Sequence, residues 1–239
     1  MSKIKYKRIL LKISGEALSG GKGFGLYPDM LERISNEIKS IKELGVETGI
    51  VVGGGNIFRG SNEQFSQIDR ASADYMGMLA TVINAVALQN YLEKMDLFTR
   101  VLSAINMESI AEPYIRRRAI RHLEKGRIVI FAAGTGNPYF TTDTAASLRA
   151  IEMEAEVVLK GTRVDGVYST DPEIDPSASK FNEMTYLQLV KDGLKIMDNT
   201  AVTLCMNHNI PIVIFNLLVK DNLKNIILGK SIGTTVENR

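Results

Sequence analysis

The segment from Gly134 to Asp143 combines two glycines with hydroxyl, amide, aromatic and carboxylate side chains. It follows an apolar run at residues 127–133 and precedes a helical pattern at residues 144–150. A strand that passes through glycines into a helix presents free backbone N–H groups and the positive end of the helix dipole, so it attracts anions. The hydroxyl and amide groups and the two aromatic rings suit a sugar and a flat base. We therefore expect a ligand that carries a phosphate, a sugar and a base.

Two other strand-like runs also end in residues suited to phosphate. Lys12 closes the apolar run at residues 8–13 and precedes a Ser-Gly bend, which places a positive charge beside free backbone N–H groups. After residues 47–52, the glycines Gly53 to Gly55 let the backbone approach a bulky ligand, and the guanidinium of Arg59 can grip a phosphate. Phosphoryl transfer depends on such positioning and charge, so the pattern favours a phosphotransferase.

Composition and motifs exclude several classes of protein. The net charge of +2 is too small to indicate binding to nucleic acid or to an anionic membrane. The sequence has no Gly-x-x-x-x-Gly-Lys-Ser/Thr motif of P-loop enzymes, and His122 and His208 lack the partners of a zinc site or a catalytic triad. The single cysteine, Cys205, is expected to be a buried structural thiol. We read no export signal at the start and no membrane span at residues 75–91, so we expect a cytoplasmic protein.

Short β-branched runs alternate with longer segments of helical periodicity. Strands are expected at residues 8–13, 47–52, 98–102, 127–132, 157–159 and 211–215, and helices at residues 28–44, 72–94, 114–125, 144–153, 186–191, 199–208 and 220–228. Several strands are apolar throughout, as in sheets covered on both faces. The alternation predicts an α/β fold, a three-layer αβα sandwich around a largely parallel sheet. We expect residues 1–239 to form a single domain with two lobes around a cleft.

Four motifs follow one another along the chain. They are Lys12-Ile-Ser-Gly-Glu-Ala-Leu18, Val52-Gly-Gly-Gly-Asn-Ile-Phe-Arg-Gly60, Gly134-Thr-Gly-Asn-Pro-Tyr-Phe-Thr-Thr-Asp143 and Lys160-Gly-Thr-Arg-Val-Asp-Gly-Val-Tyr168. With them the chain resembles the bacterial uridylate kinases, which have the amino-acid-kinase fold, over essentially its whole length. The resemblance implies a UMP kinase that transfers the γ-phosphate of ATP to UMP with Mg²⁺ in pyrimidine biosynthesis. It also implies a homohexamer that GTP activates and UTP inhibits.

The resemblance assigns site residues by position. ATP would contact Lys12, Ile13, Ser14, Gly15, Gly55, Arg59, Thr162, Tyr168 and Asp171. UMP would contact Gly54, Asp74, Thr135, Gly136, Asn137, Pro138, Tyr139, Phe140, Thr141 and Thr142. The segment linked to GTP activation would comprise Gly20, Gly21, Lys22, Gly23, Phe24 and Gly25. Arg163 stands where many relatives carry lysine, a change that keeps the positive charge.

The acceptor chemistry limits what the catalytic residues must do. A phosphate monoester is mostly dianionic at neutral pH, so no general base is required. We expect Lys12 to neutralise the transferring phosphoryl group, Arg59 to bridge the two phosphates, and Asp143 to orient lysine or magnesium-bound water. The sequence shows no dense carboxylate cage, so we expect the phosphates of ATP to hold Mg²⁺, without a dedicated protein metal site.

Two alternatives remain open. A carboxylate or carbamate kinase of the same fold has no evident use for the aromatic pair Tyr139 and Phe140. A non-catalytic nucleotide- or oxyanion-binding protein need not keep Lys12, Arg59 and Asp143 together.

Apolar residues lie on more than one face of the helix expected at residues 73–92. This pattern indicates a helix at an interface between subunits, with deep burial as the alternative.

Overall fold

The computed structural model describes residues 4–20, 22–60, 67–170, 175, 177–194 and 196–238. Within these residues a nine-stranded sheet has the order β4-β3-β5-β2-β1-β6-β10-β11-β9, and β7 pairs separately with β8. The strands are β1 (Arg8–Ile13), β2 (Glu47–Val52), β3 (Thr99–Ser103), β4 (Glu112–Pro113), β5 (Ile128–Ala132), β6 (Val157–Thr162), β7 (Val167–Tyr168), β8 (Lys180–Phe181), β9 (Glu183–Thr185), β10 (Ile212–Asn216) and β11 (Thr234–Glu237).

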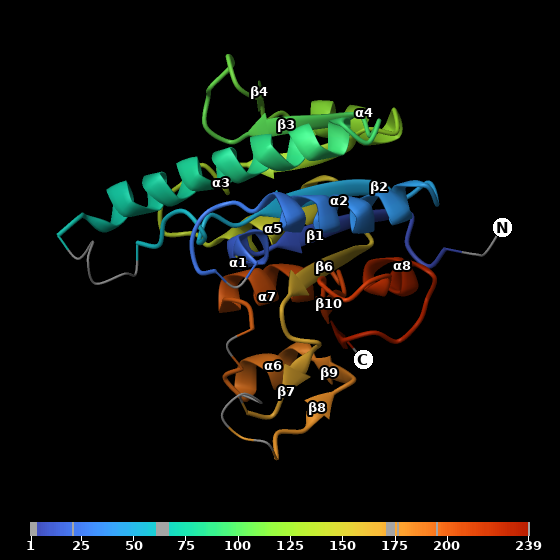
Figure 1. Ribbon diagram of the computed structural model, residues 1–239. Helices are drawn as coiled ribbons and strands as arrows, with labels where there is room; N and C mark the ends of the chain where they lie inside the picture. Colours follow the sequence, from blue (N-terminus) through green and yellow to red (C-terminus); the bar gives the residue numbers. More distant parts are fainter. Residues whose placement is uncertain are drawn as a thin grey trace.

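Helices cover both faces of this sheet (Figure 1). They are α1 (Gly15–Ser19), α2 (Pro28–Lys42), α3 (Arg70–Glu93), α4 (Arg116–Glu124), α5 (Thr142–Glu152), α6 (Tyr186–Lys191), α7 (Asn199–Asn207) and α8 (Asn222–Ile227). Ile9 and Leu11 of β1 belong to a core cluster with α2, α3 and α8, whereas Leu10 belongs to a second cluster with α4, α5, α6 and α7. Successive strand residues point to opposite faces, so β1 contributes to both layers. The predicted three-layer sandwich is confirmed.

The direction of the strands explains where a site can form. In the described sheet each pairing is parallel apart from that of β10 with β11, so the prediction of a largely parallel sheet is confirmed. Parallel strands end at the same edge, and ligands of such sheets bind beyond their carboxyl ends. The ends of β1, β2, β5 and β6 therefore bring the four sequence motifs to one edge.

Three predicted elements have the same bounds in the structure. The strands expected at residues 8–13 and 47–52 and the helix at residues 186–191 coincide with β1, β2 and α6. The strand expected at residues 157–159 extends to Thr162 in the structure. The prediction stopped early because the apolar pattern ends at Lys160, whereas the pairing with β1 and β10 continues beyond it. The sequence missed α1, β4, β7, β8, β9 and β11, which have two to five residues each. Elements of this length are too short to show a period.

Helix α3 is the longest helix of the described chain and has two apolar faces. Asp69 caps its start by accepting a hydrogen bond from the Ser72 backbone N–H at 3.0 Å. Met78, Val82 and Leu88 are buried, whereas Tyr75, Met76, Leu79, Ile83 and Val86 are exposed. Its length and composition alone would allow it to cross a membrane. Because one face packs on the sheet and bonds its loops, we interpret α3 as a core helix with an apolar outer stripe.

Candidate active site

Two lysines lie side by side near the carboxyl ends of β1 and β6. Lys12 and Lys160 are register partners in these parallel strands, so their side chains leave the same face of the sheet. Asp143 of α5 joins them. Its Oδ1 lies 2.8 Å from Lys12 Nζ, and its Oδ2 lies 2.7 Å from Lys160 Nζ. Both lysines are 7% exposed, so the three side chains form a mostly buried cluster with an excess of positive charge.

The pKa values of the cluster reflect burial and mutual attraction. Burial raises the pKa of Asp143, but the two lysines and their hydrogen bonds outweigh it and hold this pKa below its ordinary value. Burial and the neighbouring Lys12 lower the pKa of Lys160, although Asp143 acts in the opposite direction. Asp143 is therefore a carboxylate that holds two cations in place, and it is poorly suited to accept a proton as a general base.

The start of α5 places Asp143 at this point. Thr141 caps the helix, and its Oγ1 accepts hydrogen bonds from the backbone N–H groups of Asp143 at 3.1 Å and Thr144 at 3.2 Å. Asp198, the cap of α7, accepts hydrogen bonds from the hydroxyls of Thr141 at 2.5 Å and Thr144 at 2.9 Å. These side-chain bonds join the starts of α5 and α7. The Lys160 ammonium also donates to the carbonyl of Ile196, just before Asp198.

The turn after β2 approaches the end of β1 too closely for side chains. The Gly53 N–H donates to the Ile13 carbonyl at 2.8 Å. A Cβ atom on Gly15 would lie 2.8 Å from the Gly55 nitrogen, and one on Gly54 would lie 2.7 Å from the Gly77 carbonyl oxygen. The glycines therefore permit an approach that larger residues would prevent.

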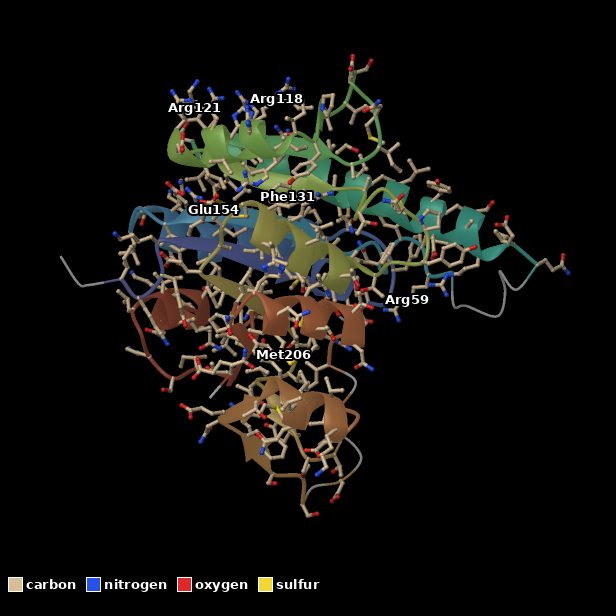
Figure 2. All side chains as sticks on the ribbon, turned by 180° about the vertical axis from the view of Figure 1, so that it is seen from behind. Arg59, Arg118, Arg121, Phe131, Glu154 and Met206 are labelled. Atoms are coloured by element: carbon tan, nitrogen blue, oxygen red, sulfur yellow. The ribbon has the colours of Figure 1, made fainter. Side chains whose placement is uncertain are left out.

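Arg59 lies at the rim of this turn. Its Nε donates to the Gly55 carbonyl at 2.9 Å, and its guanidinium forms an ion pair with Glu16. Arg163 reaches the other oxygen of Glu16 at 3.5 Å. Figure 2 shows Arg59 at the same edge of the molecule as the start of α3. Two guanidinium groups thus face the strand ends, with one carboxylate between them.

The loop after β5 is held in an unusual backbone conformation. Ala133 and Tyr139 have φ values of 60° and 73°, in the left-handed region that non-glycine residues seldom adopt. The Ala133 N–H donates to the Thr81 hydroxyl at 2.9 Å, and the Tyr139 N–H donates to Asp74 Oδ2 at 2.7 Å. Both acceptors belong to α3, so this helix fixes the loop at two points. Asp74 is itself paired with Arg70, whose Nε lies 2.9 Å from its oxygens.

A cavity of about 440 Å³ lies between α3, the turn after β2 and the loop after β5. It is lined by Gly54, Gly55, Phe58, Arg59, Gly60, Arg70, Ala73, Asp74, Gly77, Met78, Thr81, Gly134, Thr135, Phe140, Thr141 and Thr142. A second cavity of about 460 Å³ lies against the starts of α5 and α7, and Thr141 lines both. Asp143 lines the second one. Through Asp143, the charged cluster borders the second cavity, and Thr141 borders both cavities.

The structure brings most of the predicted residues to this edge. Of the residues predicted to bind UMP, Gly54, Asp74, Thr135, Phe140, Thr141 and Thr142 line the first cavity, whereas Gly136, Asn137, Pro138 and Tyr139 are not among the described residues that line it. Of those predicted to bind ATP, the residues from Lys12 to Gly15 and Gly55, Arg59 and Thr162 lie at the ends of β1, β2 and β6.

Three predicted groups lie elsewhere or outside the described residues. Tyr168 lies on β7, in the small lobe that β7, β8, β9 and α6 form below the rest of the molecule in Figure 1, and its hydroxyl donates to Asp165 at 2.6 Å. Asp171 and Gly21 lie outside the described residues. The remainder of the glycine-rich segment, Gly20 and residues 22–25, follows α1 and joins the turn after β2 through a 2.7 Å bond from the Gly25 N–H to the Asn56 carbonyl.

Sequence reasoning gave no role to several residues that shape the site. The only sequence signal for Lys160 is its likeness to Lys12. Each lysine lies within an apolar strand and shortly before a glycine: Gly15 follows Lys12 by three positions, and Gly161 follows Lys160 directly. Asp198 precedes a helical pattern, which is an N-cap signal, but the sequence does not show which helix it joins. Glu16, Asn56, Thr81 and Asn84 carried no signal beyond polar side chains near glycines or within a helix.

The described residues include no group of three or more His, Cys, Asp or Glu side chains arranged to hold a metal ion. Asp143 is a candidate ligand near the strand ends, but both of its oxygens already contact lysines.

Comparison with known proteins agrees with this geometry. Residues 7–216 match the model of the amino acid kinase family. The chain belongs to the amino acid kinase family. A UMP kinase from Bacillus anthracis is 41% identical with a TM-score of 0.94, over 97% of this chain and 96% of its own. A UMP kinase from Ureaplasma parvum is 36% identical with a TM-score of 0.90, and the match covers 98% of this chain and 100% of that one. A uridylate kinase from Archaeoglobus fulgidus is 25% identical with a TM-score of 0.74, and the match covers 95% of this chain and 99% of that one.

Proposed function

We propose that this amino acid kinase family member is a UMP kinase, a nucleoside monophosphate kinase that transfers the γ-phosphate of ATP to UMP and forms UDP. The observation that carries the proposal is the Lys12–Asp143–Lys160 cluster, in which Asp143 lines one cavity and lies two residues from Thr141, which lines that cavity and a second one. Two cavities suit two substrates whose phosphates meet between them. The full-length similarity to the UMP kinases of Bacillus anthracis and Ureaplasma parvum supports this choice of substrate.

The acceptor site is the cavity beneath α3. Asp74 accepts hydrogen bonds from its surroundings and offers a carboxylate for ribose hydroxyls or base N–H groups. The exposed ring of Phe140 and the hydroxyls of Thr135 and Thr142 line the same space, which suits a flat base and its sugar. A small carboxylate substrate would leave these groups without partners.

The charged cluster performs the electrostatic part of the reaction. The UMP phosphate is already mostly dianionic at neutral pH, so the barrier arises from bringing two polyanions into line. Lys12 and Lys160 place positive charge where the transferring phosphoryl group passes, and Asp143 fixes both ammonium groups beforehand. Arg59, at the rim of the first cavity, bridges donor and acceptor phosphates.

Mg²⁺ accompanies ATP in this proposal, held mainly by the phosphates, and supplies charge neutralisation on the donor. The ends of β1 and β2, from Lys12 to Gly15 and at Gly55, hold the donor phosphates through backbone N–H groups. Thr162, Tyr168 and Asp171 are assigned to the adenosine end of ATP from the family resemblance.

The remaining assignments concern the whole enzyme. We propose a single domain of two lobes that assembles as a homohexamer in the cytoplasm, with GTP as activator and UTP as inhibitor. The exposed apolar stripe on α3 supports an interface between subunits. Light scattering should report six subunits, and a monomer would contradict this part of the proposal.

A coupled assay of ADP release tests the function. Purified protein with MgATP should turn over UMP, with CMP much poorer, and should leave aspartate, glutamate and acetylglutamate unphosphorylated. Turnover of a carboxylate would identify a different member of the family. Binding of ATP and UMP without any turnover would favour a regulatory or storage protein. Repeating the assay with GTP measures the proposed activation.

A further inference from the structure

A pair of fully buried amides connects α3 with the glycine turn after β2. Asn56 and Asn84 are both 0% exposed. Asn84 Nδ2 donates to Asn56 Oδ1 at 2.7 Å, and Asn56 Nδ2 donates to Asn84 Oδ1 at 3.1 Å. Each amide thus donates one hydrogen bond to the other and accepts one from it, although the two residues are 28 positions apart in the sequence.

The second N–H of each amide reaches the backbone of a glycine segment. Asn84 Nδ2 donates to the Gly53 carbonyl at 2.6 Å, and Asn56 Nδ2 donates to the Gly25 carbonyl at 2.9 Å. An asparagine amide has two N–H donors, so both residues use their full donor capacity. A buried amide group that loses its partner is costly, which makes this arrangement well defined.

The pair lies directly behind the groups that face the cavity. A Cβ atom on Gly15 would come within 2.5 Å of Asn56 Oδ1, so the amide occupies the space between the ends of β1 and β2. Gly54 and Gly55 line the first cavity, whereas Asn56 and Asn84 are not among the described residues that line it. The pair therefore reaches the lining of this cavity through the glycine turn, by the bond from Asn84 to the Gly53 carbonyl.

We propose that Asn84, acting through Asn56 and Gly53, is a positioning residue that holds the Gly53–Gly55 turn in the geometry required for phosphoryl transfer. This inference rests on the proposed function. Three consecutive glycines have no side chains to fix their own conformation, so outside contacts must supply the restraint. Misplacement of reacting groups by about 1 Å can cost on the order of a hundredfold in rate.

The role differs from general support of the fold. Helix α3 is also anchored by the buried side chains of Met78, Val82 and Leu88 and by the bond between Thr81 and the Ala133 N–H. Loss of Asn84 should therefore leave the helix in place and release the turn. A purely structural residue would change the amount of folded protein, not the rate of folded enzyme.

Steady-state kinetics of Asn84→Ala, Asn56→Ala and the double variant test the proposal, with Asn90→Ala, an exposed position on the same helix, as the matched control. We expect Asn84→Ala to lower kcat by about tenfold to a hundredfold, with KM values for ATP and UMP within about threefold of wild type. Because the two amides act as a unit, the double variant should lose no more than Asn84→Ala alone. Asn90→Ala should retain wild-type kinetics.

The outcomes separate this inference from the proposed function. If wild-type protein forms no UDP, the proposed function fails and the inference falls with it. If wild type is active and Asn84→Ala keeps its kcat, or the two losses multiply in the double variant, the inference alone is wrong. Circular dichroism and thermal unfolding show whether each variant is folded. Should Asn84→Ala not fold, Asn84→Ser removes the same donors to Gly53 and Asn56 and is judged by the same criteria.

Discussion

Two charged clusters at the strand ends differ in their exposure to water. The side chains of Lys12, Lys160 and Asp143 are 9%, 9% and 15% exposed. Those of Arg59, Glu16 and Arg163 are 50%, 40% and 55% exposed. Charges interact more strongly away from water, whereas exposed ion pairs contribute about 0–1 kcal/mol.

For the proposed kinase, we infer a different role for each cluster. The buried cluster is fixed before any ligand arrives, as electrostatic stabilisation of a transition state requires. The exposed cluster is weakly held, so Arg59 and Arg163 can exchange Glu16 for a ligand phosphate at small cost. The predictions that follow separate these two roles, from the largest expected effect to the smallest.

Asp143→Asn should have the largest effect, because it leaves two ammonium groups buried side by side without their counter-charge. Removing one partner of a buried ion pair costs about 3–5 kcal/mol of stability. We expect a loss of kcat on the order of a hundredfold or more, since both lysines lose their fixed positions. Urea denaturation and turnover of UMP measure the two effects. A stable and active variant would contradict a preorganised cluster.

Lys12→Ala should lower kcat on the order of a hundredfold or more and leave UMP affinity largely intact. The reason is that its charge acts on the phosphoryl group in transfer, while Asp74 and the loop after β5 line the acceptor cavity. Initial-rate kinetics with UMP varied provide kcat and KM. Near-normal turnover would show that Lys12 is dispensable and would shift the assignment to Lys160.

Acid should weaken the buried cluster selectively. The folded-state pKa of Asp143 lies below its unfolded value, so its contribution to stability is complete above the unfolded pKa and is lost as pH falls through the folded pKa. We therefore expect the free energy of unfolding to fall below pH about 4, the ordinary range of an aspartate. Asp143→Asn should show a shallower dependence in the same urea titration. If the unfolding free energies of wild type and Asp143→Asn changed with pH at the same slope, the lowered pKa of Asp143 would be contradicted.

Glu16→Gln should have the smallest effect, because its ion pairs are exposed. Stability should change by about 1 kcal/mol or less. Freeing Arg59 and Arg163 from a competing carboxylate should lower KM for ATP by less than about fivefold. Kinetics at low and high salt measure the effect, which screening should reduce. A large loss of kcat would instead give Glu16 a catalytic role.

Much of the fold and part of the site followed from local patterns. Apolar runs predicted β1 and β2 with correct bounds, and the periodicity of residues 28–44 predicted α2. These predictions succeed because the spacing of apolar residues along a short stretch of sequence distinguishes a strand from a helix. Lys12, Arg59 and Asp143 were predicted as catalytic residues because they accompany glycine-rich strand ends, and the expected contact of Asp143 with a lysine is present.

Other features depend on distances that no local pattern encodes. Lys160 joins Lys12, 148 positions earlier in the chain, because β6 pairs with β1 in one particular register. Asp198 bonds the threonines of α5, and Asn84 bonds Asn56, only because the packing of helices brings them together. The sequence alone determined the parallel strands β3, β5, β2, β1, β6 and β10 of the sheet and the glycine-rich turns at their ends. Only the tertiary structure decided which charges and amides meet there, since strand register and helix docking are set by the whole core.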